Sequence, residues 1–252
     1  MRSSNFHTHT TYCDGKDSPE ELVIAAVENG CRAIGFSGHS YTGIDDDSPF
    51  CMTKEGTEEY KKDLQRLKEK YKDKIAVYTG IEQDYYSAHP ADGYDYVIGS
   101  VHYILKDGVY LSVDHTLEEQ KKDIAEHYGG DAYAYVGDYY ALVGDLYNRT
   151  HCNIVGHFDL VTKFGEKEKL FDTSDSRYIS AAFGALEKLF GHGLCFEINY
   201  GAIARGYRTS PYPEKTILDK ILSSGERVIY TSDCHDKSKL LLGIPEDAED
   251  YM

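Results

Sequence analysis

Apolar segments of strand length alternate with amphipathic segments of helix length along almost the whole chain of 252 residues. We predict seven strands, at about residues 6–10, 33–37, 75–82, 96–102, 153–157, 194–199 and 228–233. The predicted helices cover about residues 19–30, 58–72, 117–128, 132–147, 176–190 and 213–224. Short links between such elements are typical of a parallel sheet with crossover helices. Seven units predict one α/β domain over residues 1–252, folded as a closed or nearly closed barrel.

Capping and turn residues mark where individual elements begin and end. Ser18 is placed as the N-cap of the first helix, with Pro19 at its first position and Glu21 completing a capping box. An excursion at about residues 103–149 follows the fourth strand and interrupts the alternation. Its Asp107-Gly108 pair stands between two apolar runs and predicts a small hairpin.

Potential metal ligands stand at or just beyond the ends of the predicted strands. His7 and His9 alternate in an extended segment, so their side chains share one face, and Asp14 follows them. The other strand ends contribute His39, Glu82, His102, His157, Asp233 and His235. In α/β barrels the carboxyl ends of the strands meet at one rim, so residues far apart in sequence converge there.

Each of these residues alone has an ordinary explanation, such as a hydrogen-bonded core histidine or a carboxylate in a surface turn. A buried cluster of five or more imidazoles with three carboxylates does not, because every buried polar group needs a partner. Divalent metal ions are such partners, and imidazole with shared carboxylate favours Zn, Fe or Mn over Ca or Mg. Paired ions about 3.5–4 Å apart clamp the oxygens of a displaced phosphoryl group, so we expect a hydrolase.

The remaining histidines fall outside this pattern. They are His89, His115, His127, His151 and His192. We expect them to be ordinary polar residues, and His115 is the strongest exception because it lies in the excursion after the fourth strand.

Charge and cysteine usage exclude several classes of protein. Asp and Glu number 43 against 27 Lys and Arg, giving a net charge of −16 without a basic cluster. Such a chain repels a nucleic-acid backbone. The six cysteines form no Cys-x-x-Cys pair, which argues against a zinc ribbon or a disulfide framework. No segment resembles a signal peptide or a membrane span, so we expect a cytoplasmic protein without nucleic-acid or membrane partners.

Taken in order, these motifs resemble the polymerase-and-histidinol-phosphatase (PHP) family. The resemblance rests on His7-x-His9, Asp14, Gly38-His39, Glu82, His102, Gly156-His157 and Asp233-x-His235. It implies a distorted seven-stranded (β/α) barrel with a trinuclear centre of two to three divalent ions. Two further segments, residues 156–160 and 197–213, are similar to the histidinol-phosphatase branch of the family.

The resemblance also implies how the ligands are shared. His7, His9, Glu82 and Asp233 would surround the first ion; Glu82, His102 and His157 the second; and Asp14, His39 and His235 the third. Glu82 would bridge the first two ions. Asp14 departs from the family pattern, since many members have a histidine at this position.

The activity implied by the resemblance is hydrolysis of a phosphate monoester through attack by a metal-bridging hydroxide. Glu82, Asp233 and His235 are the expected catalytic residues. The branch implies histidinol phosphate as the substrate, within histidine biosynthesis. Two alternatives stay open: a phosphoesterase acting on another phosphorylated small molecule or on phosphotyrosine, and a non-catalytic metal-binding scaffold.

Three basic residues are candidates for binding the phosphate. Arg205 and Arg208 lie just beyond the sixth predicted strand, and a guanidinium can make bidentate contacts to phosphate oxygens. Lys163 follows the His157 motif and is a third candidate.

Overall fold

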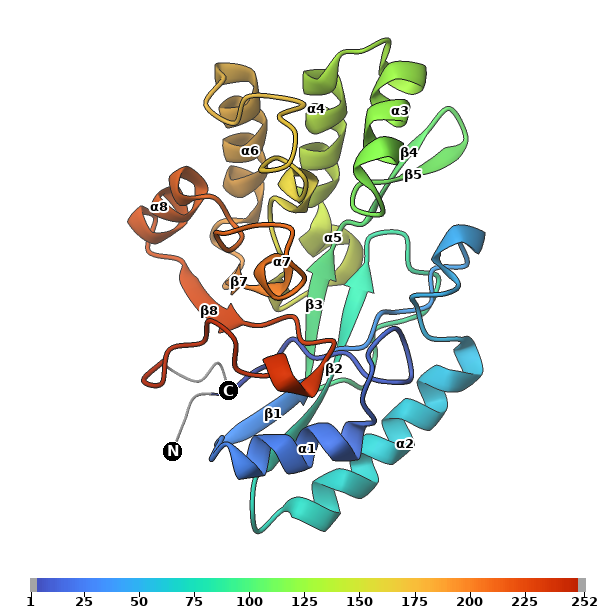
Figure 1. Ribbon diagram of the computed structural model, residues 1–252, viewed down its shortest axis with the longest axis vertical. Helices are drawn as coiled ribbons and strands as arrows, with labels where there is room; N and C mark the ends of the chain where they lie inside the picture. Colours follow the sequence, from blue (N-terminus) through green and yellow to red (C-terminus); the bar gives the residue numbers. More distant parts are fainter. Residues whose placement is uncertain (1–3, 249–252) are drawn as a thin grey trace.

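The computed structural model describes residues 4–248 and places six parallel strands in one curled sheet (Figure 1). In sheet order the strands are β1 (Ala33–Phe36), β2 (Ala76–Asp84), β3 (Tyr96–Ser100), β6 (Ile154–Val155), β7 (Cys195–Asn199) and β8 (Arg227–Thr231). All five neighbouring pairs are parallel. The α/β class and the parallel sheet are therefore confirmed.

The first predicted strand is an extended segment with isolated bridges instead of a ladder. Asn5 pairs with Ile34 of β1, and Thr8 pairs with Cys234, beyond the end of β8. The backbone N–H of Cys234 donates to the carbonyl of His7 at 3.0 Å, and that of His9 donates to the carbonyl of Cys234 at 2.8 Å. The segment thus contacts β1 and the chain just beyond β8, but the sheet itself has six strands, so the prediction of seven is met only in part.

The predicted helices are present with two differences, and the structure adds a short helix, α7 (Gly201–Ala204), that the sequence does not predict. The helices are α1 (Pro19–Glu28), α2 (Lys54–Tyr71), α3 (Leu117–Tyr128), α4 (Ala132–Val143), α5 (Leu146–Thr150), α6 (Ser176–Leu189), α7 (Gly201–Ala204) and α8 (Lys215–Ser223). The capping box of α1 is present, with Ser18 and Glu21 each accepting a backbone hydrogen bond from the other. Helix α2 begins four residues earlier than predicted, because Thr53 caps it.

The second difference is a break in the helix predicted over residues 132–147. Helix α4 ends at Val143, and α5 begins at Leu146. The intervening Gly144 lies so close to α6 that a Cβ added to it would be 3.1 Å from the Cα of Ala185. This contact brings α4 and α6 side by side above the sheet (Figure 1).

The predicted hairpin is confirmed as β4 (Tyr103–Lys106) paired antiparallel with β5 (Val109–Ser112). Its turn residues, Asp107 and Gly108, both have positive φ, of 51° and 80°. Two successive left-handed residues form the tight turn that matches the twist of a hairpin. The hairpin leaves the sheet directly after β3, and α3 and α4 complete the excursion.

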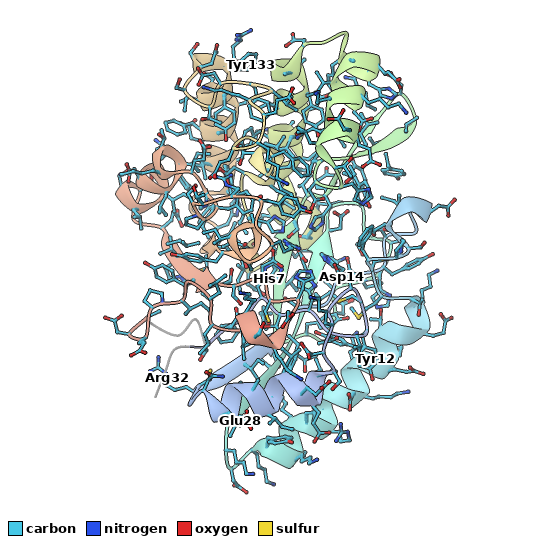
Figure 2. All side chains as sticks on the ribbon, viewed as in Figure 1. His7, Tyr12, Asp14, Glu28, Arg32 and Tyr133 are labelled. Carbon is cyan, nitrogen blue, oxygen red and sulfur yellow. The ribbon has the colours of Figure 1, made fainter. Side chains whose placement is uncertain are left out.

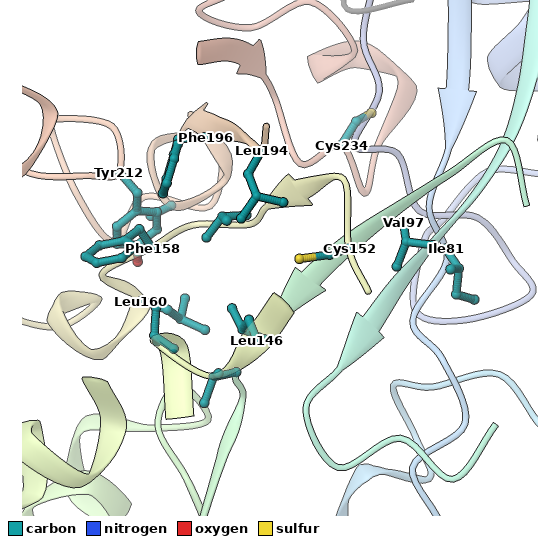
Figure 3. Close-up of a cluster of buried hydrophobic side chains, with 14 of the residues drawn as sticks. Ile81, Val97, Leu146, Cys152, Phe158, Leu160, Leu194, Phe196, Tyr212 and Cys234 are labelled. Atoms are coloured by element: carbon teal, nitrogen blue, oxygen red, sulfur yellow. The ribbon is translucent and has the colours of Figure 1, made fainter. Parts of the chain in front are cut away.

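The two faces of the sheet contact separate apolar clusters. The outer face packs under the helices, and Figure 3 shows the part of this cluster that includes Val97, Phe158 and Phe196. The inner face holds a smaller cluster that includes Tyr96 and Ile98. Residues 96, 97 and 98 therefore alternate between the faces, as side chains of a strand do.

Tyr96 fills the interior of the curled sheet. Its hydroxyl donates to the carbonyls of Phe6 at 2.6 Å and Phe36 at 3.0 Å. Gly35 and Gly80 make room for its ring, since a Cβ at either position would come within 2.5 Å of a Tyr96 atom. Among the described residues, no helix is both long and apolar enough to cross a membrane.

Candidate metal centre

Nine predicted ligands converge at the carboxyl ends of the strands. The extended N-terminal segment supplies two of them, and the turn after it supplies one. The others lie in β2 or just beyond β1, β3, β6 and β8. The nine are His7, His9, Asp14, His39, Glu82, His102, His157, Asp233 and His235. Figure 2 labels His7 and Asp14 near the middle of the molecule.

Glu82 stands at the centre of the group, and its side chain is fully buried. Its Oε2 is 2.8 Å from Nδ1 of His39 and 3.3 Å from Nε2 of His7. Its Oε1 is 2.9 Å from Nε2 of His157 and 3.4 Å from Nε2 of His102. Burial alone would raise the pKa of Glu82, but His39, His7 and His102 hold this pKa well below its usual range. The carboxylate is therefore charged and available to a cation on both of its oxygens.

Asp233 forms a second focus of the cluster. Its Oδ1 lies 3.3 Å from Nε2 of His9, 3.7 Å from Nε2 of His7 and 3.4 Å from Nδ1 of His235. The Asp233 backbone has a φ of 46°, a left-handed conformation that is uncommon for residues other than glycine. A Cβ on Gly201 would come 2.3 Å from Oδ2 of Asp233, so only glycine at position 201 leaves this carboxylate its place.

Asp14 forms the third focus. Its Oδ2 lies 3.2 Å from Nε2 of His235, and its Oδ1 lies 3.6 Å from Nε2 of His39 and 3.7 Å from Nδ1 of His9. Burial would raise the pKa of Asp14, but His39 and His235 lower it far more. The Asp14 carboxylate is thus charged and surrounded by imidazoles.

Several ring nitrogens and two carboxylate oxygens of the cluster are buried without a hydrogen-bond partner. They include Nε2 of His7, His9 and His235, and Oδ1 of Asp14. Three overlapping groups bring their donor atoms within 4.8 Å of one another: His9, Asp14, His39 and His235; His7, His9 and Asp233; and His39, Glu82 and His102. Buried polar atoms without partners are costly, and a divalent cation satisfies this type of donor set. The residues present therefore fit a multinuclear metal site.

Two further carboxylates hold the ligand rings from behind. Oε1 of Glu197 lies 2.6 Å from Nδ1 of His7, and its Oε2 accepts from the backbone N–H of His157 at 2.9 Å. Oδ2 of Asp84 lies 3.1 Å from Nδ1 of His102. An acceptor at Nδ1 keeps the proton on that nitrogen and leaves Nε2 free to bind a metal. Neither role is predicted from the sequence, although Asp84 stands two residues beyond Glu82 and Glu197 is the first residue of the segment 197–213.

Burial and nearby charges give the imidazoles of the cluster different pKa values. Burial alone would lower the pKa of His39, but the carboxylates of Glu82 and Asp14 raise this pKa to about 9. Burial, reinforced by His235 and His39, lowers the pKa of His9 to about 3. The imidazole of His9 is thus neutral at any ordinary pH, whereas that of His39 carries a proton that a bound cation would have to displace.

A cavity of about 740 Å³ opens onto the cluster and contains two of the three predicted phosphate-binding residues. Arg205 lines it, with Nη2 3.0 Å from Oδ2 of Asp233. Lys163 also lines it, with Nζ 2.9 Å from Oδ2 of Asp114. His115, the expected exception among the other histidines, is a third lining residue.

Arg208 is placed elsewhere. It lines a separate, smaller cavity of about 140 Å³, where its guanidinium donates to Oγ1 of Thr162 and packs over the ring of Tyr212. Because its side chain turns away from the metal cluster into this second cavity, the structure does not bring Arg208 to the predicted phosphate site.

The chain resembles several known proteins in both sequence and structure. The histidinol-phosphatase of Bacillus subtilis is 25% identical, over 93% of this chain and 94% of the relative. A solved Listeria monocytogenes structure, provisionally assigned as a histidinol phosphatase, superimposes with a TM-score of 0.81 at 20% identity, covering 95% of this chain and 98% of the other. The Lactococcus lactis histidinol phosphate phosphatase, solved with zinc, L-histidinol and phosphate, gives a TM-score of 0.65 at 20% identity and covers 94% and 87%.

A family model adds the decisive match. The model of the PHP domain matches residues 5–201, which include seven of the nine clustered ligands and both carboxylates behind them. The structural likenesses support the same fold. This chain belongs to the PHP domain family.

Proposed function

We propose that this protein is a metal-dependent phosphatase that hydrolyses L-histidinol phosphate to L-histidinol and phosphate in the cytoplasm, as a step of histidine biosynthesis. The observation that carries the proposal is the cluster of six imidazoles and three carboxylates at the base of one large cavity. The names of the relatives supply the substrate class. The complete ligand set speaks against a scaffold that has lost its chemistry.

We further propose two to three ions, of Zn, Fe or Mn, held as the family pattern suggests. The overlapping donor groups support this arrangement, because His9 and His39 each belong to two of them. Glu82 is the proposed bridge, since each of its oxygens faces a different set of rings. Bound divalent ions would supply positive charge that activates water and offsets charge on the phosphoryl oxygens.

The protein's own residues would bind and orient the substrate around these ions. Arg205 and Lys163 line the cavity beside the cluster and are the proposed contacts to the phosphate oxygens. Glu82, Asp233 and His235 remain the proposed catalytic residues. His235 and Asp233 both line the cavity, so their side chains would lie beside the reacting phosphoryl group.

We also propose that residues 5–9 act as the seventh strand and close the sheet into a distorted barrel within a single domain over residues 1–252. The hydrogen bonds from this segment to β1 and to Cys234, just beyond β8, support the closure. This arrangement would hold His7 and His9 at a fixed distance from Asp233.

The test is phosphate release from a panel containing L-histidinol phosphate, sugar phosphates, nucleotides and phosphotyrosine, with Zn-, Fe- or Mn-loaded protein. We expect two to three ions per chain by elemental analysis and the highest kcat/KM with L-histidinol phosphate. Asp233→Asn should abolish release while the melting temperature stays close to that of the wild type, and His192→Ala, outside the cavity, should change neither. Higher kcat/KM with another phosphate would replace the substrate, and less than one ion per chain would refute the metal site.

A further inference from the structure

The wall of the cavity beyond the metal cluster carries an aromatic pair that the proposed chemistry does not use. Phe50, from the loop after β1, and His115, from the excursion, both line the cavity, and their ring centroids lie 5.0 Å apart. Phe50 is 38% exposed although it is large and apolar. An exposed apolar ring beside a reactive centre is a typical feature of a ligand-binding surface.

Hydrogen bonds hold this wall in place. The buried carboxylate of Asp47 accepts from Oγ1 of Thr42 at 2.6 Å and from the hydroxyl of Tyr103 at 3.1 Å. The same hydroxyl lies 3.4 Å from Nε2 of His115. Tyr103 directly follows the cluster ligand His102 in the chain, so the wall and the metal cluster are built on one continuous segment.

The charge of the wall complements a cation. The cavity lining contains eight Asp or Glu residues against four Lys or Arg. Asp14, Glu82 and Asp233 would be offset by bound ions, but Asp47 and Glu119 lie on the wall. Oε2 of Glu119 is 4.0 Å from Nδ1 of His115. Aromatic faces backed by carboxylates attract cations that also present an aromatic or apolar surface.

We propose that the Phe50–His115 wall binds the leaving group of the substrate, an alcohol that carries an ammonium and an imidazole. The inference rests on the proposed function and adds the residues that select the alcohol. In this arrangement the phosphate faces the cluster, Arg205 and Lys163, while the imidazole packs against Phe50 and the ammonium lies in the field of Asp47 and Glu119.

The test measures binding of the product L-histidinol by titration calorimetry on metal-loaded protein, alongside kcat/KM for L-histidinol phosphate and for glycerol 2-phosphate. Phe50→Leu and His115→Ala should each raise the Kd of L-histidinol about tenfold, the loss expected for one aromatic contact. The preference for L-histidinol phosphate over glycerol 2-phosphate should fall by a similar factor. Metal content and melting temperature should match those of the wild type, since neither side chain is fully buried.

The matched control is His192→Ala, which removes an exposed histidine outside the cavity and should leave the Kd unchanged. An unchanged Kd in both wall variants, no binding of L-histidinol to the wild type, or an equal loss with both esters would overturn the inference. Wild-type protein that binds L-histidinol through this wall but releases no phosphate from L-histidinol phosphate would instead overturn the proposed function alone.

Discussion

Replacing Glu197 by Gln should weaken metal binding although Glu197 itself is not a predicted ligand. Its carboxylate is buried and faces three nitrogens: Nδ1 of His7 at 2.6 Å, the backbone N–H of His157 at 2.9 Å and Nδ2 of Asn199 at 3.0 Å. The backbone N–H of His157 and Nδ2 of Asn199 can only donate. With Nδ1 of His7, the carboxylate of Glu197 therefore accepts from three donors. A carboxylate satisfies all three, whereas the NH₂ group of an amide must face at least one of them.

Either orientation of the introduced amide disturbs the cluster. If its NH₂ faces His7, then Nδ1 must become the acceptor and the ring proton moves to Nε2, the nitrogen that faces Glu82 and Asp233. If it faces the other two donors, they lose their partner, which costs about 1–3 kcal/mol. Changes of this type lower metal affinity about 10- to 100-fold, which corresponds to about 1.4–2.7 kcal/mol.

The assay is competition for zinc against a fluorescent chelator, with circular dichroism to verify the fold. Glu226→Gln is the matched control, because this carboxylate accepts one exposed backbone N–H from Gly191 and lies outside the cavity. We expect the control to bind zinc as the wild type does. Wild-type affinity in a folded Glu197→Gln protein would refute the argument that Glu197 fixes the tautomer of His7.

Three further predictions concern the carboxylate of Asp84 behind His102, the protonation of His39 and the buried hydroxyl of Tyr96. Asp84→Asn should lower zinc affinity by a factor in the same range, because Asp84 Oδ2 accepts from the ring and the backbone of His102, and unchanged chelator competition would contradict this. Zinc affinity should rise with pH up to about 9, because the ion must displace the proton of His39, whose pKa is raised to about 9; a flat profile in the same assay would count against it. Tyr96→Phe should lower the free energy of unfolding by about 1–3 kcal/mol in urea titrations, because it removes the one hydroxyl donor that the buried carbonyls of Phe6 and Phe36 share, and a loss below about 0.5 kcal/mol would contradict that estimate.

The convergence of the nine side chains could be predicted because the sequence pattern shows where the strands end. Buried parallel strands read as apolar runs, and a parallel sheet brings the residues after those runs to one rim. This reasoning does not require exact boundaries. β6 has only two residues, yet His157 still reaches the cluster because it follows the strand closely.

The carboxylates behind the rings could not be predicted in the same way. Asp84 extends β2 two residues beyond Glu82, where polarity hides the strand from a hydropathy pattern although Gln83 and Asp84 still pair with β3. The role of Glu197 depends on donors that come from different parts of the chain. Arg208, in contrast, was predicted at the phosphate site, but its position in the sequence does not show that its side chain turns toward Thr162.

The N-terminal segment, which contacts β1 on one side and Cys234 on the other, also sets the order in which the site can be assembled. His7 and His9 leave the ribosome first, but Asp233 and His235 are made more than two hundred residues later. At a synthesis rate of about 5–20 residues per second, Asp233 is synthesised roughly ten seconds or more after His7 and His9. A nascent chain therefore lacks the complete cluster of histidines and carboxylates until the sequence around Cys234 can dock beside the first segment.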